Sequence, residues 1–365
     1  MKVGIIGLPQ TGKTSLYNAL TRSQVELNRF GSTEVNVAVI PVPDPRFDHA
    51  VAVCSPKKIT PAVLEVTEGG GRIEREERKA DKFGADFFVA VRNVETLVLT
   101  VRAFDDPKIP LPDYGINPRL EAEKILEELL LADLTVIESR LERLDKARLQ
   151  KRQSPGEAAE QQVLEKLKKS LENLEPVRFV ELSEDEKRSI RSYAFVSGKP
   201  LIIVANVHED LAGEENPAGL EALEVYAKEQ GVPLIAMCAK VEMEIAQMEP
   251  EEEREFLEAM GIKEAARDRL IRAAYAALGQ MSFFTVGEDE VRAWTIAVGT
   301  IAVGAAEKIH SDLARGFIRA EVISWNDFYA AQGCWDAAKA TGKMRLEGKE
   351  YVVHDGDILH VRFKV

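Results

Sequence analysis

The segment VGIIGLPQTGKTSLYNAL, residues 3–20, joins a short apolar run, a glycine-containing loop and a helix-forming stretch. Within it Gly7, Gly12, Lys13 and Thr14 match the pattern G-x-x-x-x-G-K-[ST]. Glycines at these positions let successive backbone N–H groups curve around phosphate oxygens, and the N-terminus of the following helix adds its dipole. The lysine can reach the β- and γ-phosphates, and the threonine hydroxyl can bind Mg²⁺. The pattern therefore predicts a strand–loop–helix unit that binds a nucleoside triphosphate.

The phosphate-binding loop is expected to run from the end of this strand into the first turn of the helix. The alternative is an ordinary glycine-rich turn that binds no ligand, and the strand–loop–helix context argues against it. The residues expected to contact the nucleotide here are Leu8, Pro9, Gln10, Thr11, Gly12, Lys13, Thr14 and Ser15.

Two further segments are candidates for the Mg²⁺ and γ-phosphate side of the site. Ser32 and Thr33 precede an expected strand and can place a hydroxyl over the metal ion, although a plain hydroxyl-rich loop would look the same. The expected strand AVLEV leads to Glu68 and, three residues later, to Gly71. In many NTPases a carboxylate at this strand end holds the Mg²⁺ shell, and a glycine N–H meets the γ-phosphate. We therefore expect Lys13, Glu68 and Gly71 to act in catalysis, although the charged residues that follow would otherwise indicate a solvated loop.

The apolar runs TLVLTV (96–101) and PLIIVA (200–205) are continuous, as expected of parallel strands that helices cover on both faces. A further strand is expected at 232–239. These runs indicate an α/β fold with a long interruption between the strands at 101 and 200. Ligands bind at the carboxyl edge of such sheets.

The polar residues that follow the run at 200–205 are candidates for reading the nucleotide base. Asn206, Val207 and Glu209 stand where guanine-specific proteins of this architecture have N-K-x-D. The longer carboxylate of Glu209 is misplaced for the paired contact with guanine, so we expect ATP to be favoured over GTP. An ordinary polar turn is the alternative. Backbone contacts to the base are also expected from the next strand end, at Cys238, Ala239 and Lys240.

Leucine and isoleucine recur at heptad spacing in the interruption, first over 130–144 and, after the break QSPG, over 164–174. This spacing predicts two helices that fold back as an antiparallel hairpin. The stretch RLERLDKARLQKR carries six basic side chains against only two acidic ones, Glu142 and Asp145. It is either a solvated helix face or a projecting arm that touches RNA phosphates, for instance on the ribosome.

The C-terminal segment, from about residue 281, alternates short strands with one helix. Strands are expected in FFTVGEDEVRAWTI, AEVISW and MRLEGKEYVVHDGDILHVRFKV, and a helix in AVGAAEKIHSDLARGF. Strands in pairs around one helix indicate a small ubiquitin-like β-grasp module. His354 and His360 lie among alternating strand residues and are expected to be structural.

Bulk composition restricts the partners and the compartment. The formal charge of −13 excludes a protein that wraps nucleic acid with its whole surface, so RNA contact needs a local basic patch. Cys54, Cys238 and Cys334 are odd in number and far apart, which predicts free thiols in the cytoplasm. No run of about 18 apolar residues is present, so no membrane span is expected. We expect a monomer.

Taken together, these segments resemble the YchF-type Obg-like ATPases over essentially the full chain. The resemblance is carried by GLPQTGKTSLYNAL, VIPVPDPRFD, the pair Asn206 and Glu209, CAKVEMEIAQ, FFTVGEDEVRAWTI and RLEGKEYVVHDGDILHVRF. It implies ATP-preferring hydrolysis with Mg²⁺, a coiled-coil arm, a C-terminal TGS domain and association with cytoplasmic ribosomes through the arm and that domain. The implied division is a P-loop domain (1–116 and 198–280), the arm (117–197) and a TGS-like β-grasp domain (281–365).

The chain departs from this family on the hydrolytic side of the site. The family's D-x-A-G reads Glu68-Gly69-Gly70-Gly71 here, with Arg72 in place of a hydrophobic residue. A loop histidine that assists hydrolysis in relatives would fall near Pro110, where no histidine is present, and TIEPN reads STEVN. We therefore expect a slow ATPase. A nucleotide-dependent binding protein without turnover, a GTP-preferring GTPase and, least favoured, a small-molecule kinase are the alternatives.

Overall fold

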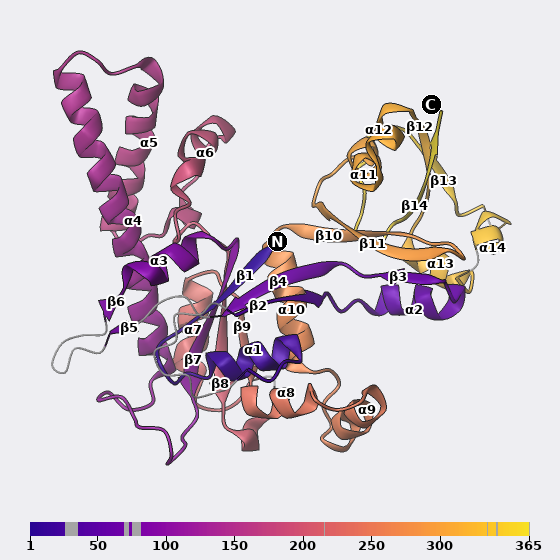
Figure 1. Cartoon of the computed structure of the whole chain (residues 1–365), viewed down its shortest axis with the longest axis horizontal. Helices are drawn as coiled ribbons and strands as arrows, with labels where there is room; N and C mark the ends of the chain where they lie inside the picture. Colours follow the sequence, from indigo (N-terminus) through magenta and orange to yellow (C-terminus); the bar gives the residue numbers. More distant parts are fainter. Residues whose placement is uncertain are drawn as a thin grey trace. The chain divides into compact units, whose positions relative to one another are not determined.

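The computed structural model describes residues 1–25, 36–68, 73–74, 82–214, 216–333, 335–340 and 342–364. The chain forms two compact units (Figure 1), each made from two stretches of sequence. The first unit comprises Met1–Ala38 and Glu65–Leu270, and the second comprises Val39–Leu64 and Ile271–Val365. Among the residues described, no helix is both long enough and apolar enough to cross a membrane.

A six-stranded sheet organises the first unit. Its strand order is β2-β4-β1-β7-β8-β9, and the neighbouring strands from β4 to β9 are parallel. Ile5 of β1 lies opposite Glu68 of β4 on one side and Val98 of β7 on the other. The carboxyl ends of these strands therefore meet at one edge, as the sequence predicts. The strands are β1 (Lys2–Ile6), β2 (Asn36–Pro41), β4 (Val63–Glu68), β7 (Thr96–Ala103), β8 (Leu201–Val207) and β9 (Leu234–Met237), with a separate pair, β5 (Ile73–Glu74) and β6 (Lys82–Phe83).

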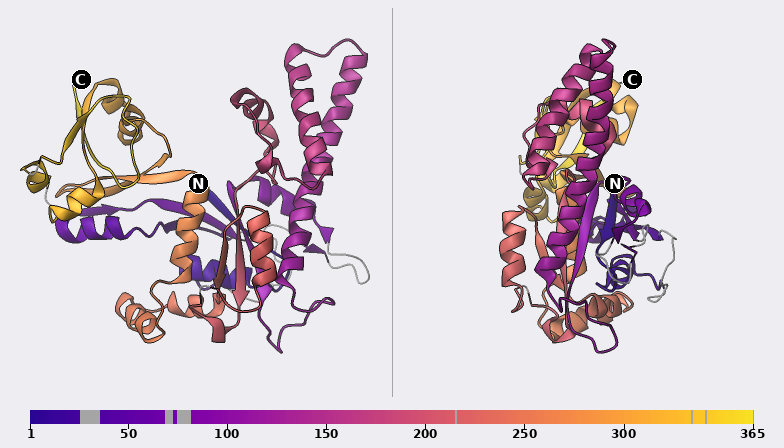
Figure 2. Two further views of the ribbon diagram at one scale, coloured as in Figure 1. Left: turned by 180° about the vertical axis from the view of Figure 1, so that it is seen from behind. Right: turned by 90° about the vertical axis from the view of Figure 1, so that its left-hand side faces the viewer.

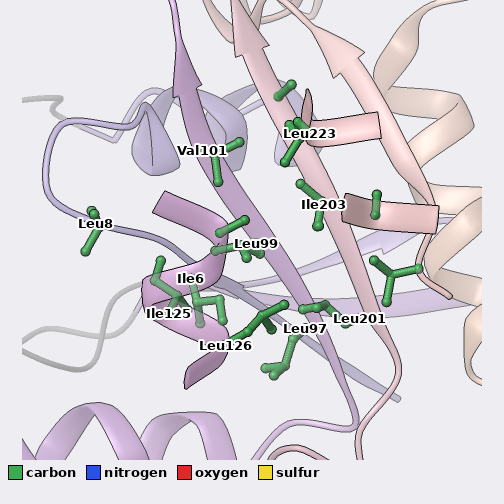
Figure 3. Packing of buried hydrophobic residues seen from close by; sticks show 14 of the residues in the cluster. Ile6, Leu8, Leu97, Leu99, Val101, Ile125, Leu126, Leu201, Ile203 and Leu223 are labelled. Atoms are coloured by element: carbon green, nitrogen blue, oxygen red, sulfur yellow. The ribbon is translucent and has the colours of Figure 1, made fainter. Parts of the chain in front are cut away.

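Helices cover both faces of this sheet. On one face Leu99 of β7 and Ile203 of β8 pack with Ile125 of α4 and Leu223 of α7 (Figure 3). The alternate residues of β8, such as Ile202, point to the opposite face and are equally inaccessible to solvent. Burying each such side chain stabilises the fold by roughly 1.5–3 kcal/mol. The other helices of this unit are α1 (Lys13–Thr21), α3 (Ala85–Arg92), α7 (Glu221–Glu229), α8 (Ala239–Ile245) and α9 (Pro250–Ala259), with a short 3₁₀ turn, η3 (Glu209–Leu211). Helix α10 (Ala266–Ala277) begins in the first unit and continues into the second.

The interruption between β7 and β8 forms the predicted helical hairpin. Helix α4 (Pro118–Leu149) and helix α5 (Pro155–Glu172) run antiparallel, side by side, in every view of Figures 1 and 2. Ser154 and Glu157 form a capping box that starts α5 immediately after the break. The seam is buried at Ile137, Leu144, Leu164, Leu167 and Leu171. Leu174 is the exception to the heptad prediction: α5 ends at Glu172, and Leu174 is 66% exposed with a left-handed backbone.

The chain returns from the arm through the α-helix α6 (Glu184–Ile190) and the 3₁₀ turns η1 (Val177–Phe179) and η2 (Arg191–Tyr193). Asp133 of α4 fixes the end of this return. Its buried carboxylate accepts hydrogen bonds from the backbone N–H groups of Val196 (3.0 Å) and Ser197 (2.8 Å) and from the Ser197 hydroxyl (2.7 Å). Burial raises the pKa of Asp133. These contacts join the arm to the start of β8, so the arm is attached to the sheet at both ends.

The second unit contains the predicted β-grasp arrangement. Strands β10 and β11 form an antiparallel hairpin, and β14 pairs parallel to β10 and antiparallel to β12. Helix α11 packs its buried alanines against Phe283 and Val322 of the sheet. The elements are β10 (Gln280–Thr285), β11 (Glu290–Ala297), α11 (Ala302–Ile309), α12 (Ser311–Arg315), β12 (Phe317–Ile323), α13 (Trp325–Ala330), α14 (Trp335–Ala340), β13 (Arg345–Glu347) and β14 (Ile358–Phe363).

The boundary of the second unit differs from the division expected from the sequence. Besides 281–365 it takes in 271–280 and residues 39–64, which contain α2 (Pro45–Cys54) and β3 (Lys58–Thr60). The physical reason is a pairing between segments far apart in the chain: β3 adds to the edge of the C-terminal sheet, parallel to β11. A three-residue strand has too little sequence pattern for its pairing partner to be predicted.

Candidate nucleotide-binding site

The loop between β1 and α1 lies at the carboxyl edge of the first sheet, and two glycines allow its path. Gly12 has φ +93°, and a Cβ atom there would overlap the side-chain amide of Asn206. At Gly7 a Cβ atom would overlap the backbone oxygen of Thr100 on β7. Gln10 also has a left-handed backbone, with φ 66°. This close approach leaves room for main chain only, which is the geometry that exposes successive N–H groups to an anion.

Lys13, the first residue of α1, folds back over this loop. Its ammonium donates a hydrogen bond to the backbone oxygen of Leu8 at 2.7 Å. Burial lowers the pKa of Lys13 to about 8, against the opposing attraction of Glu68 and Glu121. The side chain thus remains cationic at neutral pH while being poorly solvated. Such a group gains strongly from an anionic partner placed beside it.

Thr14, Glu68 and Asn36 meet on the adjacent side of the loop. The Thr14 hydroxyl donates to Glu68 Oε1 at 3.0 Å, and Asn36 Nδ2 donates to Glu68 Oε2 at 2.8 Å. Glu68 is buried at the end of β4, and Asn36 is the first residue of β2. The sequence predicted Glu68 and Thr14 but not Asn36. The available signal was its position at the start of the strand that follows the first helix, where it faces the same sheet edge.

These oxygen donors suit a hard divalent cation. Thr14 Oγ1 and the two carboxylate oxygens of Glu68 are of the type that Mg²⁺ prefers, and Mg²⁺ usually takes one or two protein ligands together with phosphate oxygens and water. Across the described ranges there is no cluster of three or more histidine, cysteine or acidic side chains that would hold a metal on its own. The arrangement therefore fits a metal that arrives with a polyphosphate.

Asn206 lies at the predicted edge, but its contacts are internal. Its amide nitrogen donates to the backbone oxygen of Thr11 at 2.9 Å, and its amide oxygen accepts from the backbone N–H of Ala239, also at 2.9 Å. The side chain is buried. Asn206 thereby joins the phosphate loop, β8 and the start of α8, and one amide hydrogen is left over for other contacts. Its main structural role is to hold the loop rather than to present a whole amide to a base.

Among the other residues predicted to contact the base, Val207 and Cys238 are buried and Glu209 is exposed. Val207 is 3% exposed and packs in the core on the face of Ile203 and Ala205, so its side chain is not at the rim. Glu209 is exposed and forms an ion pair with Lys240, whose hydrogen bond lowers the pKa of the Glu209 carboxyl. Cys238 is buried, and burial raises the pKa of its thiol.

Three of the predicted residues lie outside the described residues. Ser32 and Thr33 fall within 26–35, and Gly71 falls within 69–72 together with Arg72.

A second polar group at this edge was missed by sequence reasoning. Arg102, at the end of β7, is 2% exposed, and its guanidinium donates to the backbone oxygens of Phe104 (3.1 Å), Ile109 (3.2 Å) and Pro110 (2.9 Å). It therefore holds the loop in which the family's histidine would lie. Glu121, in the first turn of α4, accepts a hydrogen bond from the Arg102 backbone N–H at 2.8 Å. A charged residue that ends a continuous apolar strand was the only signal.

The whole chain aligns with known proteins. The ribosome-binding ATPase YchF of Bacillus subtilis (strain 168) is 40% identical over 371 aligned residues, which span 100% of both proteins. The chain belongs to the YchF family. The YchF relative from Escherichia coli O157:H7 is 39% identical, with 100% of this chain and 99% of the relative covered. A family model named YchF-GTPase_C, described as a protein of unknown function (DUF933), matches residues 280–364.

A solved YchF structure confirms the fold. The Schizosaccharomyces pombe YchF GTPase matches with a TM-score of 0.83 at 30% identity, covering 99% of this chain and 97% of that one. The resemblance inferred from the sequence motifs is thus confirmed, as is the α/β fold with its helical hairpin and C-terminal module.

The buried carboxyl of Glu121 predicts a pH dependence of stability. Burial raises its pKa from 4.5 to about 7, so between these values the folded protein binds more protons than the unfolded chain. The free energy of unfolding therefore falls as pH rises through this window. Glu121→Gln keeps an acceptor for the Arg102 N–H without this titration. Relative to the variant, the wild type should lose up to roughly 3 kcal/mol between about pH 4.5 and 7.5, measured by urea unfolding. Parallel pH profiles for the two proteins would contradict the assignment.

Proposed function

We propose that the chain is a P-loop nucleoside triphosphatase that binds ATP with Mg²⁺, hydrolyses it slowly and associates with the ribosome. The observation that carries the proposal is that the Lys13 ammonium, the Thr14 hydroxyl and the Glu68 carboxylate lie beside a loop that requires glycine at positions 7 and 12. The names of the relatives, ribosome-binding ATPases, point to the same activity.

Each of these groups has a distinct part in the proposed site. Backbone N–H groups of residues 8–15 bind the phosphates, and Lys13 places its positive charge against the β- and γ-phosphates. Thr14 would supply a ligand to the metal ion, and Glu68 accepts the hydrogen bond of the Thr14 hydroxyl. Mg²⁺ neutralises charge on the phosphate oxygens when bound. We propose that a hydroxyl of Ser32 or Thr33 lies over the metal ion and that the Gly71 N–H meets the γ-phosphate.

We expect slow turnover because the loop after β7, expected on the γ-phosphate side of the site, lacks a histidine. The loop held by Arg102 reads FDDPKIP and contains no histidine. Water activation then has to rely on carboxylates or on backbone groups, whereas positioning and charge stabilisation by Lys13 and the metal remain. A nucleotide-dependent binding protein without turnover is the second candidate, and the same loop favours it.

The base preference rests on Glu209. The ion pair with Lys240 engages this carboxylate, and its extra methylene moves it away from the paired contact that an aspartate makes with guanine. We therefore propose ATP as the favoured nucleotide, with Asn206, Val207 and Ala239 contributing mainly backbone or residual contacts. The solved Schizosaccharomyces pombe relative is named a GTPase, and this name supports the GTP alternative.

The basic stretch of the arm is the proposed contact with ribosomal RNA, together with the TGS-like module at 281–365. Arg143, Lys146, Arg148, Lys151 and Arg152 are exposed. Arg140 is not available in the same way, because Glu160 engages its guanidinium through two hydrogen bonds. A cluster of exposed cations on an acidic protein suits a local contact with phosphates. We propose a monomer of the cytoplasm, with 1–116 and 198–280 as the nucleotide domain and 117–197 as the arm.

Replacing the lysine of the phosphate loop tests the enzyme. Lys13→Ala removes the cation that faces the phosphates, and we expect steady-state phosphate release from ATP to fall by at least about tenfold. Lys2→Ala, an exposed lysine on the neighbouring strand, is the matched control and should retain wild-type turnover. Equal background release from the wild type and Lys13→Ala would leave the non-hydrolysing alternative.

Competition for a fluorescent nucleotide tests the base preference. ATP should displace the probe at a lower concentration than GTP in the presence of Mg²⁺, because the Glu209 carboxylate cannot make both guanine contacts. If GTP competes tenfold better or more, the proposed role of Glu209 is wrong.

Charge reversal tests the arm. The triple variant Arg148→Glu, Lys151→Glu, Arg152→Glu should weaken co-sedimentation with ribosomes, and raising the salt concentration should weaken the wild type toward the variant. A control with the same change in net charge uses Lys228→Glu, Arg254→Glu and Lys263→Glu, all exposed elsewhere in the first unit. Equal loss in both triples would indicate net charge alone, and unchanged binding of the arm variant would exclude this surface.

A further inference from the structure

The segment Asn36–Glu68 begins and ends at the nucleotide site. Asn36, at the start of β2, donates a hydrogen bond to Glu68, at the end of β4, and Glu68 in turn accepts from Thr14. Both ends belong to the first compact unit. The intervening residues Val39–Leu64 belong to the second unit. The segment therefore leaves the site, enters the other unit and returns.

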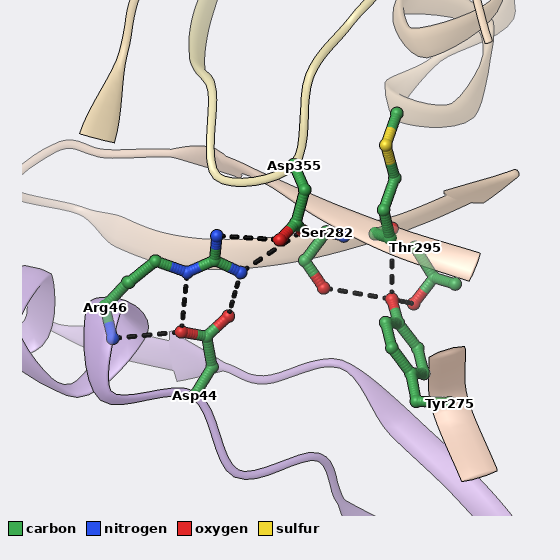
Figure 4. A network of polar contacts seen from close by, with 7 residues as sticks. Asp44, Arg46, Tyr275, Ser282, Thr295 and Asp355 are labelled. Atoms are coloured by element: carbon green, nitrogen blue, oxygen red, sulfur yellow. Dashed lines mark hydrogen bonds and ion pairs between the residues drawn. The ribbon is translucent and has the colours of Figure 1, made fainter. Parts of the chain in front are cut away.

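Within the second unit an ion-pair cluster anchors this segment. Asp44 caps α2 by accepting from the Arg46 backbone N–H, and its carboxylate also binds the Arg46 guanidinium (Figure 4). The other edge of the guanidinium donates to Asp355 at 2.8 Å, and Asp355 also accepts from the Ser282 backbone N–H on β10. Gly356, with φ +84°, leaves the space that Arg46 occupies, because a Cβ atom there would contact the guanidinium. The backbone at Gly356 therefore leaves room for the Arg46 guanidinium beside Asp355.

Strand pairing and an aromatic contact secure the same segment. Lys58, Ile59 and Thr60 of β3 pair with Glu290, Val291 and Arg292 of β11, respectively, and the Thr60 hydroxyl donates to Glu290 at 2.6 Å. Phe47 is buried, and its ring lies 6.1 Å from that of Phe284. Backbone pairing together with a buried ring holds the segment more firmly than a surface ion pair alone would.

The connections between the anchor and the site are short and stiff. Only residues 42–44 separate β2 from α2, and the sequence PVPDP places prolines at 41, 43 and 45. Proline fixes φ, so this connection has few alternative conformations. Val42 N–H also bonds to the Ala62 oxygen at 2.8 Å, which joins the outgoing and returning chains. These features restrict the path of the chain between Asn36 and the anchor.

We propose that Asn36–Glu68 is a tether through which the second unit positions the metal side of the nucleotide site. Asn36 positions the Glu68 carboxylate directly, and Arg46 positions Asn36 through β2. The inference rests on the proposed function and deepens it, because it makes Mg²⁺-dependent nucleotide binding depend on contacts in the second unit. By linkage, nucleotide binding must then stabilise the anchor to the same extent.

The first test needs no nucleotide. Hydrogen exchange is compared for the wild type, Arg46→Ala and Arg362→Ala, the last removing an ion pair with Glu321 that does not involve the tether. Arg46→Ala should speed exchange of the backbone amides at 36–38 and 65–68, which belong to the first unit, and Arg362→Ala should not. Faster exchange confined to 39–64 would overturn the tether. Asp355→Ala provides the same test if Arg46→Ala fails to fold.

The second test measures the affinity of a fluorescent ATP analogue with Mg²⁺ and with EDTA. Asn36→Ala should weaken binding about tenfold with Mg²⁺ and less than about twofold in EDTA, and Arg46→Ala should weaken it about three- to tenfold in the same pattern. Because Arg46 acts through Asn36, the double variant should bind no worse than Asn36→Ala alone. Multiplying effects, or an Arg46→Ala affinity like that of Arg362→Ala, would refute the coupling.

The two tests separate the tether from the function. A wild type that binds no nucleotide refutes the proposed function, while the exchange experiment still decides whether the anchor controls the ends of β2 and β4. A wild type that binds nucleotide, with Arg46→Ala unchanged in both tests, refutes only the tether.

Discussion

The buried amide of Asn206 is the contact on which the geometry of the site depends. Its side chain bonds to the backbone of the phosphate loop at Thr11 and to the start of α8 at Ala239. It thereby connects the carboxyl ends of β1, β8 and β9. Gly12 is required next to it because the amide occupies the space that a side chain would need. An unpaired amide or carbonyl in this position would cost roughly 1–3 kcal/mol. The loop is held by contacts of the protein itself, so part of the entropy cost of ordering it falls on folding rather than on binding.

Buried charged groups of both signs lie around this loop. Lys13 is poorly solvated, and the two carboxyl groups that attract it are buried as well: Glu68 beside Thr14, and Glu121, whose pKa is raised to about 7. Buried groups of opposite sign stabilise one another only partly, because each has lost its water. The proposed ligand, a polyphosphate with its metal, would supply an anion for Lys13 and a cation for Glu68.

Much of the fold follows from local pattern, because parallel strands covered on both faces must be apolar throughout, as TLVLTV and LIIVA are. The phosphate loop and Glu68 were also predictable, since their residue types and spacing are dictated by phosphate and metal chemistry. Contacts between distant segments were not. Asn36 reaches Glu68 and β3 reaches β11 only because of strand pairing in three dimensions. Val207 was assigned from a motif, whereas β8 continues through it and the alternation of strand side chains turns it into the core.

Arg102 holds the loop after β7 through main-chain oxygens of the loop. The guanidinium binds main-chain oxygens of Phe104, Ile109 and Pro110, so the residues between them can change without loss of these contacts. The exposed side chains of Asp105 and Lys108 make none of these contacts, whereas the Asp106 carboxylate accepts a hydrogen bond from the Lys108 backbone N–H at 2.9 Å. A substitution of Asp105 or Lys108 can therefore change what the loop presents at this edge of the sheet while the Arg102 contacts beneath it stay in place.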